Sequence, residues 1–213
     1  MSTPADYYDL SRVRPEVIAA LDKINAMGPA FATRAKAVDD DASFPTENYK
    51  DLADAGFLGL SIPQEFGGWG FSMGEYAMVG AEIAKYCGAT ALTFNMHNSS
   101  MAWSRFMYDM PNLSAEEKAA FAPLREKQFR RAMKERAIYS QPISEGGQNW
   151  TSKPNQTQCR AVDGGWKING FKKFASLAGY CDYYTIVCTE VFDGIDPRHE
   201  DTMLFVVHKD APG

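Results

Sequence analysis

The stretch at residues 139–147 reads YSQPISEGG, and it stands where the hydrophobic pattern of the chain changes its period. Before it, apolar residues recur every three or four positions, which is typical of helices that turn one face towards a core. After it, short runs rich in β-branched and aromatic residues predict strands. Because helices and strands occupy separate parts of the chain, the sequence predicts an α+β protein and argues against an alternating βαβ fold.

Helices are predicted throughout the part of the chain before this stretch. An apolar stripe from Val17 to Met27 marks the first of them. Two capping boxes, in which Ser72 and Ser114 each precede a Glu by three residues, mark two further helix starts. The predicted ranges are 16–27, 45–55, 72–86, 89–108 and 114–136. The helix at 89–108 consists mostly of apolar and small residues, so we expect it at the centre of an all-α helical bundle formed by residues 1–136.

The remainder, residues 137–213, is predicted to form about five strands. Asp163-Gly164-Gly165 is a hairpin signal between runs at 157–162 and 166–168, and further runs lie at 183–190 and 202–208. The sequence thus predicts an antiparallel β-barrel-like domain. So few strands cannot close a barrel, so we expect this domain to be incomplete at the C-terminus, with unpaired edges and exposed apolar faces such as 204–207.

The composition is that of an ordinary globular protein, with 45% hydrophobic residues, 23% charged residues and a net charge of −5. The negative charge and the lack of a basic stripe interleaved with aromatics argue against nucleic-acid binding. No run approaches the ~18 apolar residues of a membrane span, and the N-terminus has no signal-peptide pattern. The four cysteines are scattered and are expected to be reduced, which predicts a cytoplasmic protein. The three histidines fit no metal-ligand spacing, so no metal site is predicted.

Three stretches resemble the acyl-CoA dehydrogenase family of flavoproteins. Residues 56–70 read GFLGLSIPQEFGGWG and look like the N-terminal signature of that family. Residues 139–147 stand where the family has its Tyr-x-x-Thr-Glu-Pro motif, and residues 169–176, NGFKKFAS, resemble its Asn-Gly-x-Lys-x-Trp-Ile-Thr strand. The spacing from Ser144 to the last stretch equals the family spacing without a gap, and two motifs in register are more specific than either alone.

The resemblance implies bound FAD and assigns residues to it. By position, Ser144 matches the threonine that bonds the pyrimidine part of the flavin, Phe174 the aromatic residue that packs on the ring, and Ser176 the hydroxyl directed at N5, where hydride arrives. Ile143 stands at the neighbouring backbone contact, and Gln141 takes the place of an aromatic residue. The full set of expected flavin contacts is Gln141, Ile143, Ser144, Phe174, Ala175 and Ser176.

The chain departs from the family pattern at several positions. Gly146 replaces a proline, and Asn149-Trp150-Thr151 stands where the family has a Gly-Ser-Asp that helps to hold CoA. Trp150 lacks the serine hydroxyl and adds bulk, so we assign it to the substrate site and expect common straight-chain acyl-CoAs to be poor substrates. Phe174 replaces the family tryptophan, and serines replace both threonines, so the hydroxyl chemistry at the flavin is preserved.

The activity that the resemblance implies is α,β-dehydrogenation of an acyl-CoA thioester to the 2-enoyl-CoA, with hydride transfer to FAD, as in fatty acid and other lipid metabolism. In the family the base is usually a glutamate of a C-terminal helical domain, which we expect to be absent from this chain, so no catalytic residue is assigned. The implied partners are an acyl-CoA, an electron-transfer flavoprotein or similar acceptor, and further subunits in a homodimer or homotetramer.

Two alternatives stay open at this point. One is a flavin-dependent monooxygenase or oxidase of the same fold. The other is a non-catalytic subunit or fragment that needs a partner, for instance in a hetero-oligomer, to supply the base. We expect residues 1–213 to be part of a longer chain or one half of such an assembly, and to be catalytically inert alone.

Three other features have simpler interpretations. The glycines at 67–70 lack the GxGxxG spacing and do not follow a strand, so they predict a tight turn rather than a phosphate-binding loop. His97 lies on the apolar helix at 89–108 and is interpreted as a core histidine with a satisfied hydrogen bond. Glu145, on a loop after a strand, is expected to orient backbone groups rather than to abstract a proton.

Overall fold

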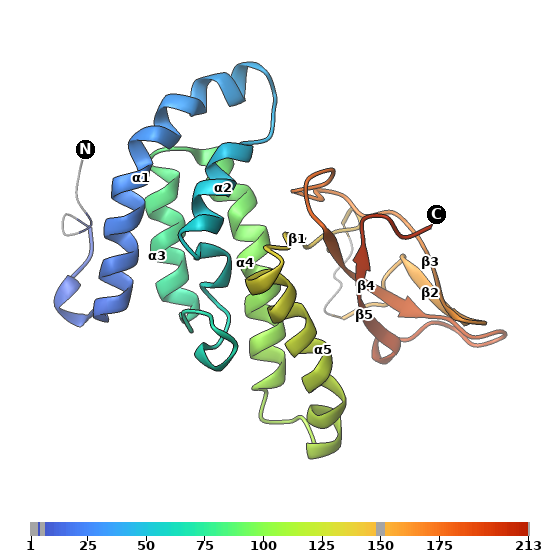
Figure 1. Ribbon diagram of the computed structural model, residues 1–213. Helices are drawn as coiled ribbons and strands as arrows, with labels where there is room; N and C mark the ends of the chain where they lie inside the picture. The colour runs from blue at the N-terminus through green and yellow to red at the C-terminus, as the bar shows by residue number, and fades with distance from the viewer. Residues whose placement is uncertain (1–3, 5–6, 148–151, 213) are drawn as a thin grey trace. The chain divides into compact units, whose positions relative to one another are not determined.

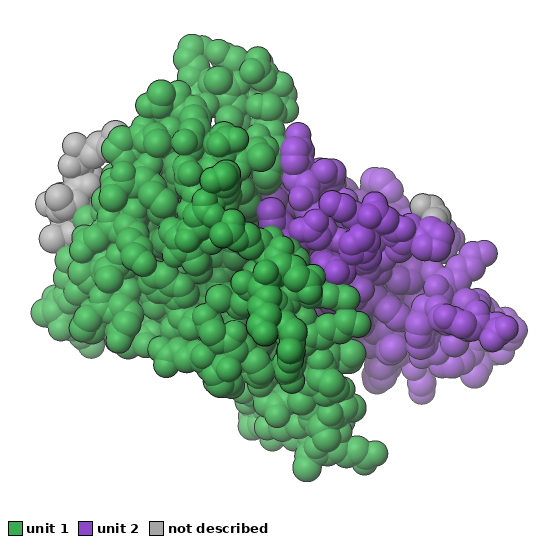
Figure 2. All heavy atoms as spheres, viewed as in Figure 1, with its two compact units in different colours: residues 1–137 green, residues 138–213 purple. Residues whose placement is uncertain are grey.

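The computed structural model describes residue 4 and residues 7–147 and 152–212 of the chain. The chain divides into two compact units, Met1–Ala137 and Ile138–Gly213, which are coloured separately in Figure 2. The first unit is helical and the second holds the sheet (Figure 1), so the α+β class and the order of helices before strands are confirmed. Among the described residues, no helix is both long enough and apolar enough to span a membrane.

The described part of the first unit forms α1 Pro15–Asp40, α2 Thr46–Asp54, α3 Met73–Ala84, α4 Gly88–Tyr108 and α5 Ala115–Lys134. Short 3-10 turns flank these helices: η2 Leu10–Arg12, η3 Phe57–Gly59 and η4 Gln64–Phe66. Helix α4 contacts each of the other four helices, which confirms its predicted place at the centre of the bundle.

Both predicted capping boxes are present. Ser72 Oγ accepts a hydrogen bond from Glu75 N at 3.4 Å, and Glu75 Oε2 accepts one from Ser72 N at 2.7 Å. Ser114 and Glu117 repeat this arrangement at the start of α5, at 3.2 and 2.8 Å. Each pair provides acceptors for N–H groups that the first helical turn leaves without a partner, which is why these helices begin where the sequence predicts.

Helix α1 runs to Asp40, well beyond the predicted end at residue 27, although Pro29 lies inside it. A proline removes one backbone N–H from the helix. Packing compensates for this loss. A Cβ on Gly28 would clash with the Tyr86 ring, so glycine lets that ring pack directly on the helix, and Phe31 is fully buried. The helix therefore continues past Gly28 and Pro29 in a region where it makes tertiary contacts.

The glycine-rich stretch at 67–70 is a tight turn, as predicted. Gly67 and Gly70 have φ values of +86° and +67°, which favour glycine. Gly70 N donates a 2.8 Å hydrogen bond to the carbonyl of Ile62, so the turn folds back on the preceding segment. A Cβ on Gly68 would clash with the same carbonyl oxygen, and no other residue fits there without a backbone shift.

The described part of the second unit folds around one sheet, with strands β1 Tyr139–Ser140, β2 Gln158–Val162, β3 Gly165–Asn169, β4 Tyr183–Glu190 and β5 Thr202–His208, and with the 3-10 turn η5 His199–Asp201 before β5. Strand β4 is central. It pairs with β5 along one edge, in a register that places Tyr183 opposite His208. Along its other edge it pairs with β1 at one end and with β2 at the other, and β3 extends the sheet beyond β2.

The sheet is mixed, whereas the sequence predicted an antiparallel one. Strands β1 and β2 run parallel to β4, and only the β2–β3 and β4–β5 pairs are antiparallel. The reason is the length of the connections. A tight hairpin forces β3 to run against β2, whereas the long segments between β1 and β2 and between β3 and β4 allow parallel pairing.

Burial alternates along the first part of β4, from Tyr183 to Val187, whereas Cys188 and Thr189 beyond it are both buried. Tyr183, Thr185 and Val187 are buried, whereas Tyr184 and Ile186 are half-buried. Because successive side chains of a strand point to opposite faces, one face of β4 packs in the interior and the other borders a more open surface.

Candidate functional site

The fold brings the two motif segments, residues 139–147 and 169–176, side by side. Lys173 N donates a 3.0 Å hydrogen bond to the carbonyl of Ser144, and Ser140 Oγ donates a 2.7 Å bond to the carbonyl of Ser176. Ser140 belongs to β1, whose parallel pairing with β4 fixes it to the sheet. Segments that are distant in sequence therefore form one continuous site in the second unit.

A buried ion pair links the same two segments. Lys172 Nζ lies 2.7 Å from Glu145 Oε1, and the two side chains are only 8% and 3% exposed. Lys172 Nζ also donates to the carbonyl of Ile143 at 3.1 Å and to Asn155 Oδ1 at 3.4 Å. The three protons of the ammonium group thus have three acceptors within reach, which a buried charge requires.

Glu145 is fully engaged with neighbouring groups. Its Oε2 accepts a hydrogen bond from Gln156 N at 2.6 Å, and its Oε1 accepts one from Thr157 N at 2.7 Å. Burial raises the pKa of this carboxyl, but the hydrogen bonds from Lys172, Thr157 and Gln156 outweigh that effect, and the resulting pKa is lower than usual. The prediction that Glu145 orients backbone groups is confirmed.

Phe174 combines an exposed ring with an unusual backbone. The side chain is 78% exposed, and φ is +59°, in the left-handed region that non-glycine residues rarely adopt. Ser176 N donates a 2.8 Å hydrogen bond to the carbonyl of Phe174, which closes a tight turn, and the following Leu177 is buried at φ +80°. Such backbone strain persists only where the surrounding structure imposes it, and it is common at functional sites.

The residues that the resemblance assigns to a flavin differ in exposure. The buried one is Gln141, the half-buried ones are Ile143, Ala175 and Ser176, and the exposed ones are Ser144 and Phe174. Within the described residues, the hydroxyls of Ser144 and Ser176 form no hydrogen bond, so both are available to a ligand. Trp150, which is assigned to the substrate, lies outside the described residues.

A groove of about 680 Å³ lies over the open face of the sheet. Its walls include apolar and aromatic side chains from three strands, namely Trp166, Ile168, Tyr184, Ile186, Phe205 and Val207. Among the predicted site residues, Ala175 lines it, beside Lys172 of the ion pair. The groove was not predicted as a site, although the apolar run at 204–207 was expected to be uncovered. The groove could have been predicted from the apolar residues that recur at alternate positions in 204–207 and in β4, since such residues share one face of the sheet.

The donors and surfaces of this site suit a flavin. The exposed Phe174 ring offers a flat stacking surface, and Ser144 and Ser176 offer hydroxyls with free hydrogen-bonding capacity. A flavin ring presents a flat face, together with an edge that carries acceptors and one N–H. The groove, which Lys172 and Ala175 of the same segment line, adds a concave, largely apolar surface of the kind found at small-molecule sites.

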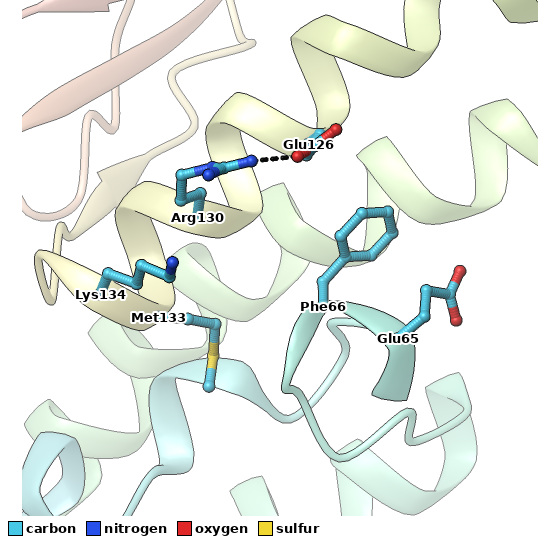
Figure 3. Close-up of a pocket in the computed structure, with 6 residues that line it drawn as sticks. All are labelled: Glu65, Phe66, Glu126, Arg130, Met133 and Lys134. Atoms are coloured by element: carbon cyan, nitrogen blue, oxygen red, sulfur yellow. Dashed lines mark hydrogen bonds and ion pairs between the residues drawn. The ribbon is translucent and has the colours of Figure 1, made fainter.

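The first unit contains a smaller pocket of about 190 Å³ between η4 and α5 (Figure 3). It is lined by Glu65, Phe66, Glu126, Arg130, Met133 and Lys134. Arg130 forms an ion pair with Glu126 along α5, so part of its charge is already balanced. No residue predicted for the cofactor or the substrate lines this pocket, and we assign it no role.

His97 on α4 is a core residue, as predicted. Its side chain is fully buried, and Nε2 lies 2.9 Å from the carbonyl oxygen of Leu58. A carbonyl oxygen only accepts hydrogen bonds, so Nε2 is the protonated nitrogen in this contact. The ring therefore ties α4 to η3 and serves packing.

Comparison with known proteins agrees with this fold. The family described as "Acyl-CoA dehydrogenase, N-terminal domain" matches residues 22–108. The benzylmalonyl-CoA dehydrogenase of Aromatoleum aromaticum is 26% identical over 183 residues, which are 86% of this chain and 44% of that protein. The structure of KijD3 in complex with FMN and dTDP-3-amino-2,3,6-trideoxy-4-keto-3-methyl-D-glucose covers 100% of this chain and 48% of its own, with a TM-score of 0.79 and 24% identity. The match to FMN-bound TdsC from Paenibacillus sp. A11-2 covers 90% of this chain and 44% of the TdsC chain, with a TM-score of 0.69 and 21% identity.

The helical unit and the mixed sheet thus form a fold that is shared with the FMN-bound structures of KijD3 and TdsC. Residues 22–108 match the N-terminal domain of the acyl-CoA dehydrogenase family, and the benzylmalonyl-CoA dehydrogenase and the putative acyl-CoA dehydrogenase YdbM of Bacillus subtilis resemble most of the chain at 26% and 25% identity. The chain spans about half the length of the curated relatives it matches, 44% and 47% for two of them.

Proposed function

We propose that this chain contributes the flavin-binding part of an FAD-dependent acyl-CoA dehydrogenase. The observation that carries the proposal is the hydrogen-bonded pairing of residues 139–147 with residues 169–176, which brings together an exposed aromatic ring and two available hydroxyls. In this proposal, residues 1–136 are the N-terminal helical domain of the family, and residues 137–213 are part of its middle β domain.

Each proposed contact has a defined task. The ring of Phe174 stacks on the flavin, the hydroxyl of Ser144 bonds to its pyrimidine edge, and the hydroxyl of Ser176 bonds at N5. When bound, FAD supplies the acceptor for the hydride that leaves the β-carbon of an acyl-CoA. The residues of this chain hold and orient the ring, and none of them is assigned as the base that removes the α-proton. The remaining proposed contacts are those of Gln141, Ile143 and Ala175.

A titration with FAD tests the proposal, with bound flavin measured by its visible absorbance after removal of the free cofactor. We expect Phe174→Ala to weaken FAD binding, because it deletes the stacking surface. Phe171→Ala is the matched control, because Phe171 is a phenylalanine of the same segment with nearly the same exposure. Phe171 is 73% exposed and Phe174 is 78% exposed. A protein that binds no flavin, or equal losses in the two variants, would contradict the proposal.

We further propose an acyl-CoA substrate, with Trp150 at the position where the family holds CoA. The support is the similarity to benzylmalonyl-CoA dehydrogenase, which is named for a CoA thioester. An electron-transfer flavoprotein or similar acceptor would reoxidise the flavin, and the assembly would be a dimer or tetramer in the cytoplasm. Reduction of the bound flavin by acyl-CoAs under anaerobic conditions, and light scattering of the purified protein, test these points.

A second candidate is an FMN-dependent monooxygenase of the same fold. Two features favour it: the solved structures of KijD3 and TdsC are FMN complexes, and Phe174 and Ser176 replace the tryptophan and threonine of the dehydrogenase motif. In the titration, tighter binding of FMN than of FAD, together with rapid oxygen consumption by the reduced protein, would support this candidate. Failure to bind either cofactor would favour a non-catalytic subunit.

A further inference from the structure

The Glu145–Lys172 ion pair joins three separate segments of the second unit. Lys172 bonds to the carbonyl of Ile143 and to Asn155, and Glu145 bonds to the backbone N–H groups of Gln156 and Thr157. Both charged side chains are almost completely buried, so water cannot replace these contacts. The pair therefore acts as a fixed junction.

Residues proposed to contact the flavin adjoin this junction on two sides. Ser144 lies between Ile143 and Glu145, both of which bond to Lys172. On the other side, Lys172 is followed by Lys173, whose N–H donates to the carbonyl of Ser144, and then by Phe174 at its strained φ. The junction thus fixes the Ser144 backbone relative to the turn that carries Phe174.

The energetics favour a geometric role for the pair. Two charges taken out of water lose hydration, and replacing a buried ion pair by neutral groups of similar size is often neutral for stability. Removing a single partner is different, because it leaves the other charge buried and uncompensated. What neutral replacements lose is the set of directional bonds that Lys172 makes to Glu145, Ile143 and Asn155.

We propose that Glu145 and Lys172 are positioning residues for the flavin ring. They act through the backbone of Ser144 and through the turn of residues 174–176. In this way they fix the distance between the Ser144 hydroxyl, which bonds to the pyrimidine edge, and the Phe174 ring, which stacks on the flavin. The inference rests on the proposed function, since it concerns the same flavin site. It adds two residues that the resemblance did not assign to the cofactor, and neither is required to touch it.

The test compares four variants of the full chain: Glu145→Gln, Lys172→Met, Lys172→Arg and the double variant Glu145→Gln/Lys172→Met. For each, thermal unfolding of the apoprotein and the Kd for FAD are measured, together with hydrogen exchange of the Lys173 amide. We expect both neutral single variants to weaken FAD binding by about tenfold or more, as the loss of charged hydrogen bonds predicts. Lys172→Arg keeps the charge and should rescue part of the affinity.

The double variant separates positioning from stability. It removes both charges, so we expect its thermal unfolding to return towards that of the wild type, whereas its FAD affinity stays low and the Lys173 amide exchanges faster. The exposed pair of Arg160 and Asp193, whose atoms are 2.6 Å apart in the same unit, supplies the control. Arg160→Met should change neither the affinity nor the exchange rate.

The outcomes distinguish this inference from the proposed function. Wild-type protein that binds neither FAD nor FMN overturns the proposed function, and the inference with it. Wild-type protein that binds flavin, while Glu145→Gln and Lys172→Met bind it equally well, overturns the inference alone. Recovery of both stability and full affinity in the double variant would show that the pair has a purely structural role, and it too would overturn the inference.

Discussion

Ser140 Oγ donates a 2.7 Å hydrogen bond to the carbonyl oxygen of Ser176, although the two residues are 36 positions apart in the sequence. The two serines have different roles. The hydroxyl of Ser140 is buried and fixes the backbone of the turn, whereas the hydroxyl of Ser176 has no partner in the part of the chain that the structure describes. Ser140→Ala therefore tests the bond that holds the turn, whereas Ser176→Ala tests ligand binding without the loss of a protein contact.

Ser140→Ala should destabilise the second unit. The substitution removes one buried hydrogen bond, so we expect the free energy of unfolding to fall by about 0.5–1.5 kcal/mol. FAD binding should weaken as well, because the carbonyl of Ser176 loses its donor and the turn is less well held. Urea unfolding and FAD titration measure the two effects. Unchanged stability would show that this bond contributes nothing.

Ser176→Ala should leave the free energy of unfolding within about 0.5 kcal/mol of the wild type, because no protein contact is lost. We expect FAD binding to weaken by about 0.5–1.5 kcal/mol, the net value of one hydrogen bond, and the flavin reduction potential to change. Titration and spectroelectrochemistry measure these quantities. A loss of stability as large as that of Ser140→Ala would contradict the assignment of this hydroxyl to a ligand.

Gly68→Ala should destabilise the helical unit by about 1–3 kcal/mol, because the new Cβ would clash with the Ile62 carbonyl oxygen and the backbone must shift. Gly80→Ala is the matched control. Gly80 lies inside α3, and a Cβ added to it would meet open space, so alanine should stabilise the helix by about 0.5–1 kcal/mol. Thermal unfolding followed by circular dichroism measures both, and similar effects in the two variants would refute the steric argument.

The stability contributed by Glu75 should depend on pH. The hydrogen bond from Arg14 at 2.6 Å, opposed by burial and supported by the Ser72 cap, lowers the pKa of Glu75 from 4.5 to about 2. Since the folded state has the lower pKa, this contribution is complete above pH 4.5 and is lost as the pH falls towards 2. Urea unfolding of the wild type and Glu75→Gln should therefore differ most at neutral pH. A difference that stays constant down to low pH would contradict this prediction.

Trp150→Ser should improve the use of straight-chain acyl-CoAs. Serine at this position would restore the hydroxyl of the family pattern and remove the bulk of the indole ring. We expect the native protein to be a poor catalyst with butyryl- to palmitoyl-CoA, assayed by dye reduction with any partner needed for activity present. Efficient turnover of these substrates by the native protein would count against the assignment.

Local patterns account for the elements that the sequence predicted well. The ranges 183–190 and 202–208 match β4 and β5, because each is an uninterrupted run rich in β-branched and aromatic residues. The starts of α3 and α5 follow from capping boxes, which involve residues only three apart. The juxtaposition of the motif segments was reached only through family resemblance.

Long-range contacts decided the features that the sequence did not predict. Where α1 continues past Pro29, the Tyr86 ring packs directly against Gly28, a contact between distant residues. The parallel pairing of β1 and β2 with β4 follows from the chain connections rather than from local pattern. In the site, Lys172 and Lys173 are adjacent and chemically identical, yet Lys172 is largely buried in an ion pair and Lys173 is exposed. Only the partners supplied by the fold distinguish them.

The positive φ of Phe174 lowers local stability, while the phenylalanine ring at this position provides the surface that we assign to ligand binding. Glycine would adopt this φ without a steric penalty, and replacing an exposed phenylalanine by glycine would sacrifice little buried apolar surface. Phe174→Gly would nevertheless abolish the aromatic surface that we assign to the ligand. The folded chain thus bears the conformational cost before any ligand arrives, so the ring is preorganised, and a variant selected for stability alone would tend to lose it.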